Sequence, residues 1–203
     1  MLRVAPLIVV VVAGVADSTF AQAPSMPAEF VERLVRAAVE QSSRPGIYDG
    51  SYRPIGYPGG DVPPNVGVCT DVVIRAYRKV GVDLQVKVHE DMERAFRDYP
   101  QLWGLSGPDA NIDHRRVPNL QTYFKRAGAA VAVTQRAADY RPGDLVTWML
   151  PGNLPHIGLV TGSRTRASGR PLIVHNIGRG PQLEDVLFAF PITGHFRYGA
   201  QWR

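Results

Sequence analysis

Residues 142–160, PGDLVTWMLPGNLPHIGLV, decide the fold class of this chain. Two runs rich in aliphatic, β-branched and aromatic residues, at 144–149 and 157–161, are separated by a Pro/Gly turn, which is typical of neighbouring antiparallel strands. Similar short runs at 172–176 and 195–198 extend the strand-rich part toward the C-terminus.

The part of the chain before these strands has helical periodicity instead. Its apolar spacing predicts four helices, over residues 27–42, 69–80, 86–99 and 118–126. The Gly- and Pro-rich segment 44–67 and the segment 101–116 are predicted to be irregular. Helices that precede an antiparallel sheet indicate one α+β domain over 27–203, with N-terminal helices packed on a short antiparallel sheet.

Residues 1–21 are predicted to be a signal peptide. Arg3 supplies a positive charge, residues 7–16 are apolar, and small residues follow as far as Ala21. Pro24 disfavours cleavage after Ala23, so we expect cleavage after Ala21 and a periplasmic or secreted protein. No later apolar run is long enough to span a bilayer, so we expect no membrane attachment after signal removal.

Composition narrows the class of protein. The chain has 203 residues, a formal net charge of +5, a pI near 9.6 and one cysteine. A hydrophobic content of 45% excludes a disordered chain, and one cysteine excludes both an internal disulfide and a cysteine-cluster zinc site. The basic charge fits an anionic polymer, and export argues against nucleic acid. The alternative is a charge that only keeps the surface soluble.

The single cysteine, Cys69, begins the predicted helix 69–80 directly after a Gly-containing loop. A thiol at a helix N-terminus lies near free backbone N–H groups and the positive end of the helix dipole, so we expect a lowered pKa and a reactive thiolate. The same N–H groups can hold an oxyanion. The alternative is a buried, inert thiol.

Two histidines lie on neighbouring predicted strands. His156 begins the strand 157–161 and His175 lies in 172–176, and adjacent antiparallel strands can bring these side chains together. A cysteine nucleophile needs a base and a group that orients the base, and this pair can supply both. Each histidine can also be purely structural. No His-x-x-x-His spacing occurs, and we expect neither a metal nor a cofactor.

Four motifs together resemble one family, the NlpC-type cell-wall cysteine peptidases. Residues 68–73, Val-Cys-Thr-Asp-Val-Val, resemble its nucleophile helix, and residues 142–146 and 156–160 resemble the next two strands. Residues 174–176 resemble the strand with the second histidine, and residues 57–60, Tyr-Pro-Gly-Gly, resemble an upstream element. The resemblance covers about residues 55–190.

Within that group the chain is most similar to an exported bacterial branch known as a domain of unknown function. That branch carries Gly-Val-Cys-Thr-Asp and Ile-Asp-His-Arg-Arg-Val, as residues 67–71 and 112–117 do here. The resemblance implies a papain-like α+β fold and hydrolysis of amide bonds in peptidoglycan peptides.

The resemblance also implies roles for individual residues. By position, Cys69 is the nucleophile, His156 the base and His175 the group that orients it. Tyr57 is implied to help hold the oxyanion or the substrate. Val68 replaces the usual Asp and Thr70-Asp71 replaces Ser-Gly, so the substrate preference of the family is not carried over.

Further candidates lie outside the Cys–His–His set. Arg115 and Arg116 can bind a stem-peptide carboxylate through bidentate hydrogen bonds, or belong to a solvated loop. Asp113 is an alternative to His175 as the group that orients His156. Asn176 is a candidate for substrate or oxyanion binding. Asp71, in the first turn of the nucleophile helix, is interpreted as a structural cap.

The preferred function is therefore an exported, monomeric cysteine hydrolase whose partners are peptidoglycan stem peptides. Two other functions stay open. One is a catalytically silent wall-binding domain, and the other is an acyltransferase with the same Cys–His pair, because water and amines attack the same acyl-enzyme.

Overall fold

The computed structural model describes residues 26–199, and the predicted signal peptide lies outside them. The helices follow the predicted periodicity: α1 (Ala28–Val39), α2 (Cys69–Lys79), α3 (Leu84–Ala95) and α4 (Val117–Arg126). Helix α3 begins two residues earlier than predicted because Asp83 accepts a hydrogen bond from the backbone N–H of Gln85 at 3.0 Å and so caps it. Short 3₁₀ turns occur at η1 (Glu40–Ser43), η2 (Phe96–Asp98), η3 (Asp113–Arg115) and η4 (Ala137–Asp139).

A six-stranded antiparallel sheet forms the second half of the molecule, in the order β3-β8-β4-β5-β6-β7. Its strands are β3 (Ala130–Val131), β4 (Leu145–Leu150), β5 (Leu154–Arg164), β6 (Pro171–Asn176), β7 (Pro181–Glu184) and β8 (Ile192–Phe196). The four predicted strands correspond to β4, β5, β6 and β8. The edge strands β3 and β7 were not predicted, because they are short and lack an apolar run.

Two more short strands lie within the segment predicted to be irregular. β1 (Ile47–Tyr48) pairs in parallel with β2 (Val66–Gly67), and Tyr48 stands opposite Gly67. This ladder joins residues almost twenty positions apart and brings Tyr48 to the residues that precede α2.

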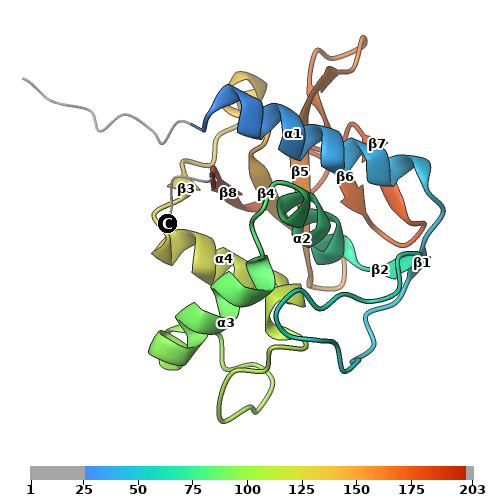
Figure 1. Ribbon diagram of the computed structural model, residues 1–203. Helices are drawn as coiled ribbons and strands as arrows, with labels where there is room; N and C mark the ends of the chain where they lie inside the picture. Colours follow the sequence, from blue (N-terminus) through green and yellow to red (C-terminus); the bar gives the residue numbers. More distant parts are fainter. Residues whose placement is uncertain (1–25, 200–203) are drawn as a thin grey trace, which may run out of the picture.

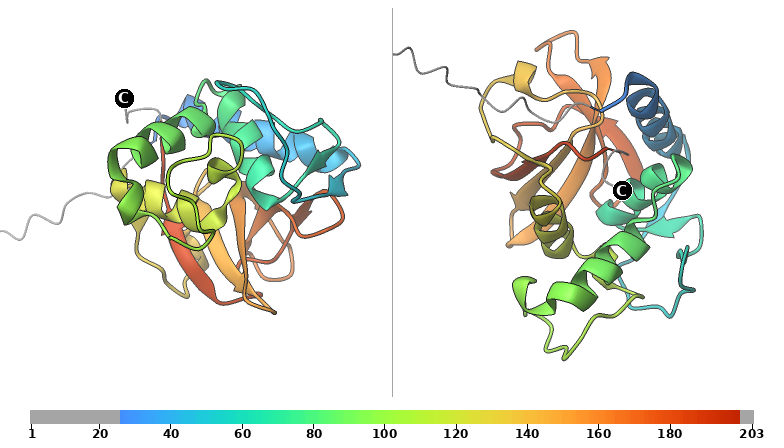
Figure 2. Two further views of the ribbon diagram at one scale, coloured as in Figure 1. Left: turned by 90° about the horizontal axis from the view of Figure 1, so that it is seen from below. Right: turned by 60° about the vertical axis from the view of Figure 1, so that its left-hand side comes forward.

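The helices cover one face of the sheet (Figures 1 and 2). Buried side chains of α1, α2, α3 and α4 pack there against Leu145, Ile157, Leu159, Val174 and Phe196. A smaller cluster on the opposite face contains Trp148, Val160 and Ile173, covered by Tyr140 and Leu187. The predicted arrangement of helices on an antiparallel sheet is confirmed. Strands β5 and β6 lie between the two hydrophobic clusters, one on each face of the sheet.

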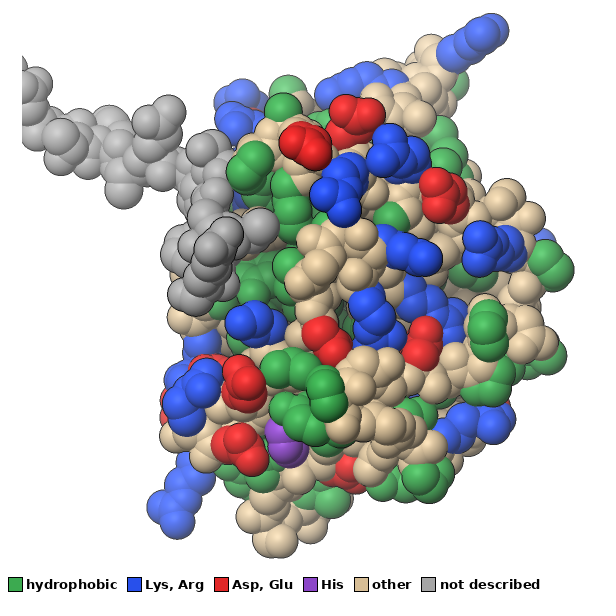
Figure 3. Space-filling model, in the orientation of Figure 1, with side chains coloured by type: hydrophobic (Ala, Val, Ile, Leu, Met, Phe, Trp, Pro, Cys, Tyr) green, Lys and Arg blue, Asp and Glu red, His purple; other side chains and the backbone are tan. Residues whose placement is uncertain are grey.

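The surface shows where the positive charge lies. Lys and Arg side chains lie over α1 and α2 in Figure 3, with Asp and Glu side chains among them. Within residues 26–199, no helix combines the length and the apolar character needed to cross a bilayer.

Candidate active site

Cys69 is the first residue of α2 and is buried. The loop before it is fixed by Asp71, whose Oδ2 accepts the backbone N–H of Val68 at 2.7 Å. Helix α2 packs against β5, and the backbone N–H of Ile157 lies close enough to the sulfur to act on the pKa of Cys69. The pairing of β6 with β5 ends at Gly158, so the thiol lies beside β5 just beyond the end of β6. Cys69 thus packs with Ile157 on the helix-covered face, whereas His156, the residue before Ile157, packs against Trp148 of the cluster on the opposite face.

His156 and His175 form a direct hydrogen bond across β5 and β6. The distance from His156 Nε2 to His175 Nδ1 is 2.9 Å, and the two rings meet edge to face. His175 Nε2 is in turn 3.0 Å from Oε2 of Glu184 on β7. Both histidines are buried, and His156 also packs against Trp148, with ring centroids 5.8 Å apart. In the described residues no hydrogen bond joins the thiol to either histidine, and His156 Nδ1 carries no protein partner.

The pKa of the Cys69 thiol differs from the lowered value expected at a helix N-terminus. Burial raises the pKa of Cys69 to about 11, although backbone N–H groups of Ile157, Thr70 and Cys69 itself act in the opposite direction. The lowered pKa predicted from the helix N-terminus is therefore wrong for the free protein, because removal from water outweighs those donors. Burial, with a further contribution from His175, lowers the pKa of His156 to about 3. At neutral pH the site holds a neutral thiol and a neutral imidazole.

Alkylation of Cys69 is expected to follow this raised pKa. The thiolate is the reactive form, so between about pH 7 and pH 9 its fraction, and the rate with iodoacetamide, should rise about a hundredfold. The measurement is the alkylation rate of the protein's single cysteine as a function of pH. A rate already on a plateau below pH 7 would contradict the raised pKa and restore the thiolate prediction.

Gly158 gives His175 its place on the sheet. It stands directly opposite His175, and a Cβ there would lie 3.1 Å from His175 Cβ and 2.7 Å from Ile173 Cγ2. Contacts this short force neighbouring groups to move. A residue without a side chain is needed here for His175 to lie against β5.

Replacing Gly158 is therefore expected to disturb the histidine pair. Gly158→Ala should displace His175 and Ile173 and lower the free energy of unfolding by about 1–3 kcal/mol. Gly162→Ala is the matched control in the same strand, because its nearest neighbour would be Pro142 Cγ at 3.8 Å. Urea unfolding of both variants tests this. Equal effects of the two substitutions would contradict the proposed packing.

The tyrosine near Cys69 is Tyr48, and not Tyr57. Tyr57 is exposed and packs its ring against His89, with centroids 5.0 Å apart. Burial raises the pKa of Tyr48 to about 12, with smaller contributions from the neighbouring Cys69 and Asp71. Tyr48 thus lies near the thiol and keeps its proton. Tyr57, implied by the family resemblance, lies against His89, and the β1–β2 pairing brings Tyr48 to the residues before Cys69 instead.

Arg115 binds side chains in the first turn of α2 and is not available to bind a substrate. Its guanidinium forms a bidentate pair with Asp71, at 2.9 and 3.0 Å, and both side chains are buried. The backbone carbonyl of Arg115 also accepts the Thr70 hydroxyl at 3.0 Å. Arg115 is occupied by Asp71 and holds the first turn of α2, which fits the interpretation of Asp71 as structural.

Asp113 and Arg116 form a separate pair away from the histidines. Asp113 accepts hydrogen bonds from Arg116 at 3.1 Å and from the backbone N–H of Asp109 at 2.5 Å. The guanidinium of Arg116 lies 4.0 Å from the ring centroid of Trp103. His175, and not Asp113, contacts His156, so the alternative orienting role for Asp113 has no support in the geometry.

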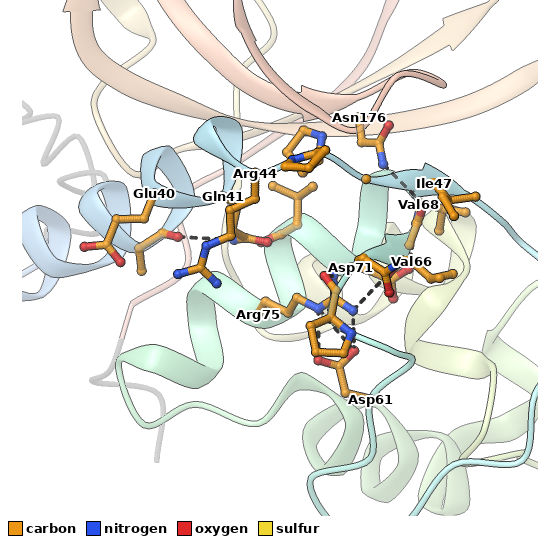
Figure 4. A pocket seen from close by; sticks show the side chains of 18 of the residues that line it. Glu40, Gln41, Arg44, Ile47, Asp61, Val66, Val68, Asp71, Arg75 and Asn176 are labelled. Carbon is orange, nitrogen blue, oxygen red and sulfur yellow. Dashed lines mark hydrogen bonds and ion pairs between the residues drawn. The ribbon is translucent and has the colours of Figure 1, made fainter.

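Asn176 and a cavity adjoin the nucleophile helix. Asn176 Nδ2 donates to the carbonyl of Gly67 at 3.2 Å, which ties the end of β6 to the residues before Cys69. A cavity of about 470 Å³ is lined by Asn176, Val68 and Asp71 together with residues of η1. In Figure 4, Glu40 lies on the side of this cavity opposite Val66 and Val68. Cys69 and the two histidines do not line it, so the cavity is adjacent to the thiol without containing it.

The cations at this cavity are not those predicted. Arg75 and Arg78 line it but pair with Asp61. Arg44 and Lys79 also line it, are exposed, and form no ion pair within residues 26–199. Arg44 and Lys79 were not predicted to line a cavity. Arg44 belongs to the Gly/Pro-rich segment, and Lys79 occupies a solvent-facing helical position, so neither carries a sequence signal for a site.

The polar groups of the site are joined to one another and are not arranged as metal ligands. Across the described part of the chain, no three His, Cys, Asp or Glu side chains are grouped in a way that could hold a metal ion. His175 instead uses both ring nitrogens for hydrogen bonds, one to His156 and one to Glu184.

Comparisons with known proteins place the chain in a family. A family model described as "Domain of unknown function (DUF1287)" matches residues 35–198. "Uncharacterized protein YijF" of Escherichia coli (strain K12) is 53% identical over 152 residues, which are 75% of this chain and 74% of that protein.

A solved structure also matches. It is a Staphylococcus aureus protein described as similar to lipoprotein, NLP/P60 family, with 12% identity and a TM-score of 0.47. The match covers 90% of this chain and 45% of that one, so this chain spans less than half of the other's length. The family match, by contrast, includes the thiol and both histidines, and with the 53% identical relative it shows that the chain belongs to the DUF1287 family.

Proposed function

We propose that the protein is an exported, papain-like cysteine hydrolase that cleaves amide bonds in peptidoglycan peptides. The observation that carries the proposal is the buried His156–His175 hydrogen bond of 2.9 Å, on strands β5 and β6 that pack against α2, the helix that Cys69 begins. A cysteine at a helix N-terminus, a base and a partner for the base are the parts that acyl transfer through a thioester requires.

The proposed reaction begins from the neutral pair. As the sulfur attacks the scissile carbonyl carbon, its proton moves to His156, so each new charge forms beside its opposite. Backbone N–H groups at the start of α2 and the protonated hydroxyl of Tyr48 stabilise the oxyanion. The imidazolium then gives its proton to the leaving amine as the C–N bond breaks. Water, deprotonated by His156, hydrolyses the thioester and restores the thiol.

The cavity beside α2 suits the charge of the proposed substrate. Peptidoglycan stem peptides carry carboxylates, and Arg44 and Lys79 present two cations at the cavity wall that have no ion-pair partner among the described residues. We expect the peptide to enter from this side and place its scissile bond over Cys69.

Mass spectrometry of purified peptidoglycan fragments tests the proposal. A hydrolase converts a fragment into two products whose summed mass exceeds the substrate by one water. An acyltransferase joins the acyl part to an added amine, and a silent binder retains fragments without changing their mass. We expect the first result, and unchanged fragments after incubation with wild-type protein would contradict the proposal.

A further inference from the structure

The hydrogen bonds of the histidine pair extend to a carboxylate, that of Glu184, on the edge strand of the sheet. In the sheet register Gln182 of β7 stands opposite His175, and Glu184 stands opposite Ile173. Strand alternation puts Glu184 and His175 on one face, where Oε2 of Glu184 lies 3.0 Å from His175 Nε2. Three strands therefore contribute one side chain each to a continuous line: His156 from β5, His175 from β6 and Glu184 from β7.

The hydrogen-bonding capacity of each group decides where the protons lie. A carboxylate only accepts, so His175 must carry its proton on Nε2. In a neutral His175, Nδ1 then carries a lone pair and accepts a hydrogen bond from the Nε2–H of His156. His156 in turn has its proton on Nε2 and a lone pair on Nδ1. Burial lowers the pKa of both rings, although Glu184 acts in the opposite direction on His175, so the neutral forms apply.

We infer that Glu184 is a positioning residue that fixes the tautomers of His175 and His156 and so leaves Nδ1 of His156 free to accept the Cys69 proton. The inference rests on the proposed function and adds a fourth member to the site. A ring held in the other tautomer would present an N–H to the thiol and could not act as a base.

Glu184 has a second effect once the proton has moved. The positive charge that forms stays on His156 and is stabilised by its hydrogen bond to His175, whose Nε2–H in turn faces the Glu184 carboxylate. The side chain of Glu184 is 42% exposed, so water screens part of this interaction. The positioning effect does not depend on that screening, because it acts through a direct hydrogen bond.

The alternative is that Glu184 only fastens the edge strand. Four residues of β7 already pair with β6 through the backbone, so the strand has its own attachment. The adjacent residue, Asp185, makes an ion pair with Arg170 at 2.8 Å on the same edge. Asp185→Asn is therefore a matched control, since it removes a carboxylate and an ion pair from the edge without touching the histidines.

The kinetic test compares Glu184→Gln with Asp185→Asn on peptidoglycan fragments. A neutral amide can donate as well as accept, so it no longer fixes the His175 tautomer. We expect Glu184→Gln to lower kcat by about 10- to 100-fold with KM and the melting temperature unchanged, the range known for partners that orient a functional histidine. Asp185→Asn should stay within about twofold of wild type. A folded Glu184→Gln protein with wild-type kcat would overturn the inference.

A second measurement needs no substrate. Two-bond ¹⁵N–¹H NMR correlations of histidine-labelled protein report which ring nitrogen carries the proton, and His156→Gln and His175→Gln assign the signals. We expect both rings to be protonated on Nε2 in wild type, and a mixture of tautomers in Glu184→Gln. Protonation of His156 on Nδ1 in wild type would overturn the inference. If fragments are not cleaved but the NMR result holds, the proposed function fails and the positioning by Glu184 stands.

Discussion

Cys69→Ala is expected to lower turnover of peptidoglycan fragments at least about a thousandfold, because the substitution removes the atom that forms the thioester. The smaller side chain is compatible with the first turn of α2, whose cap is Asp71, so the protein should remain folded. His156→Gln should have an effect of similar size, since the proposed mechanism uses His156 as the base for the thiol. The measurement is kcat/KM with thermal unfolding as a check on the fold.

His175→Asn provides the graded control for this series. An amide can still accept from His156 Nε2, so we expect a loss smaller than that of His156→Gln. Full activity of folded Cys69→Ala would contradict a cysteine mechanism. Equal and complete losses in all three variants, with unfolding, would show only that the site supports the fold.

Arg115→Ala is expected to have the largest effect on stability. The side chains of Arg115 and Asp71 are only 2% and 4% exposed and form a bidentate pair. Removing the guanidinium leaves a buried carboxylate without its charged partner, which lowers the free energy of unfolding by about 3–5 kcal/mol. Urea unfolding measures this change. Because Asp71 also holds the N–H of Val68, activity should fall with it.

Arg36→Ala is the control for Arg115→Ala. Arg36 pairs with Glu32 at 3.5 Å on the surface of α1, where the two side chains are 59% and 76% exposed. Loss of such a pair changes the free energy of unfolding by no more than about 1 kcal/mol. If Arg115→Ala were as mild as this control, the pair with Asp71 would not be what holds the start of α2.

The elements with strong periodicity could be predicted from the sequence. Helices α1, α2 and α4 and strands β4, β5, β6 and β8 have apolar patterns that extend over several residues. The strand β7 has none, and Glu184 could not be assigned to the site without it. Tyr48 was missed for a related reason, because a two-residue parallel ladder between β1 and β2 leaves no periodic signal.

The ionisation of the thiol shows a different limit of prediction. The position of Cys69 at a helix N-terminus is visible in the sequence and favours the thiolate. Its burial under β5 depends on the tertiary structure, and that burial raises the pKa of Cys69 to about 11. Arg115 is a similar case, since its partner Asp71 lies 44 residues away in the sequence.

The thioester is the central claim, and an acid-quenched intact mass measurement tests it most directly. A stem-peptide ester is used as substrate, because a good leaving group makes acylation faster than hydrolysis of the acyl-enzyme. The account predicts that wild-type protein gains the mass of the acyl group, that the adduct maps to Cys69, and that Cys69→Ala gains nothing. Hydrolysis of the ester by wild-type protein with no adduct at any quench time, or an equal adduct on Cys69→Ala, would contradict it.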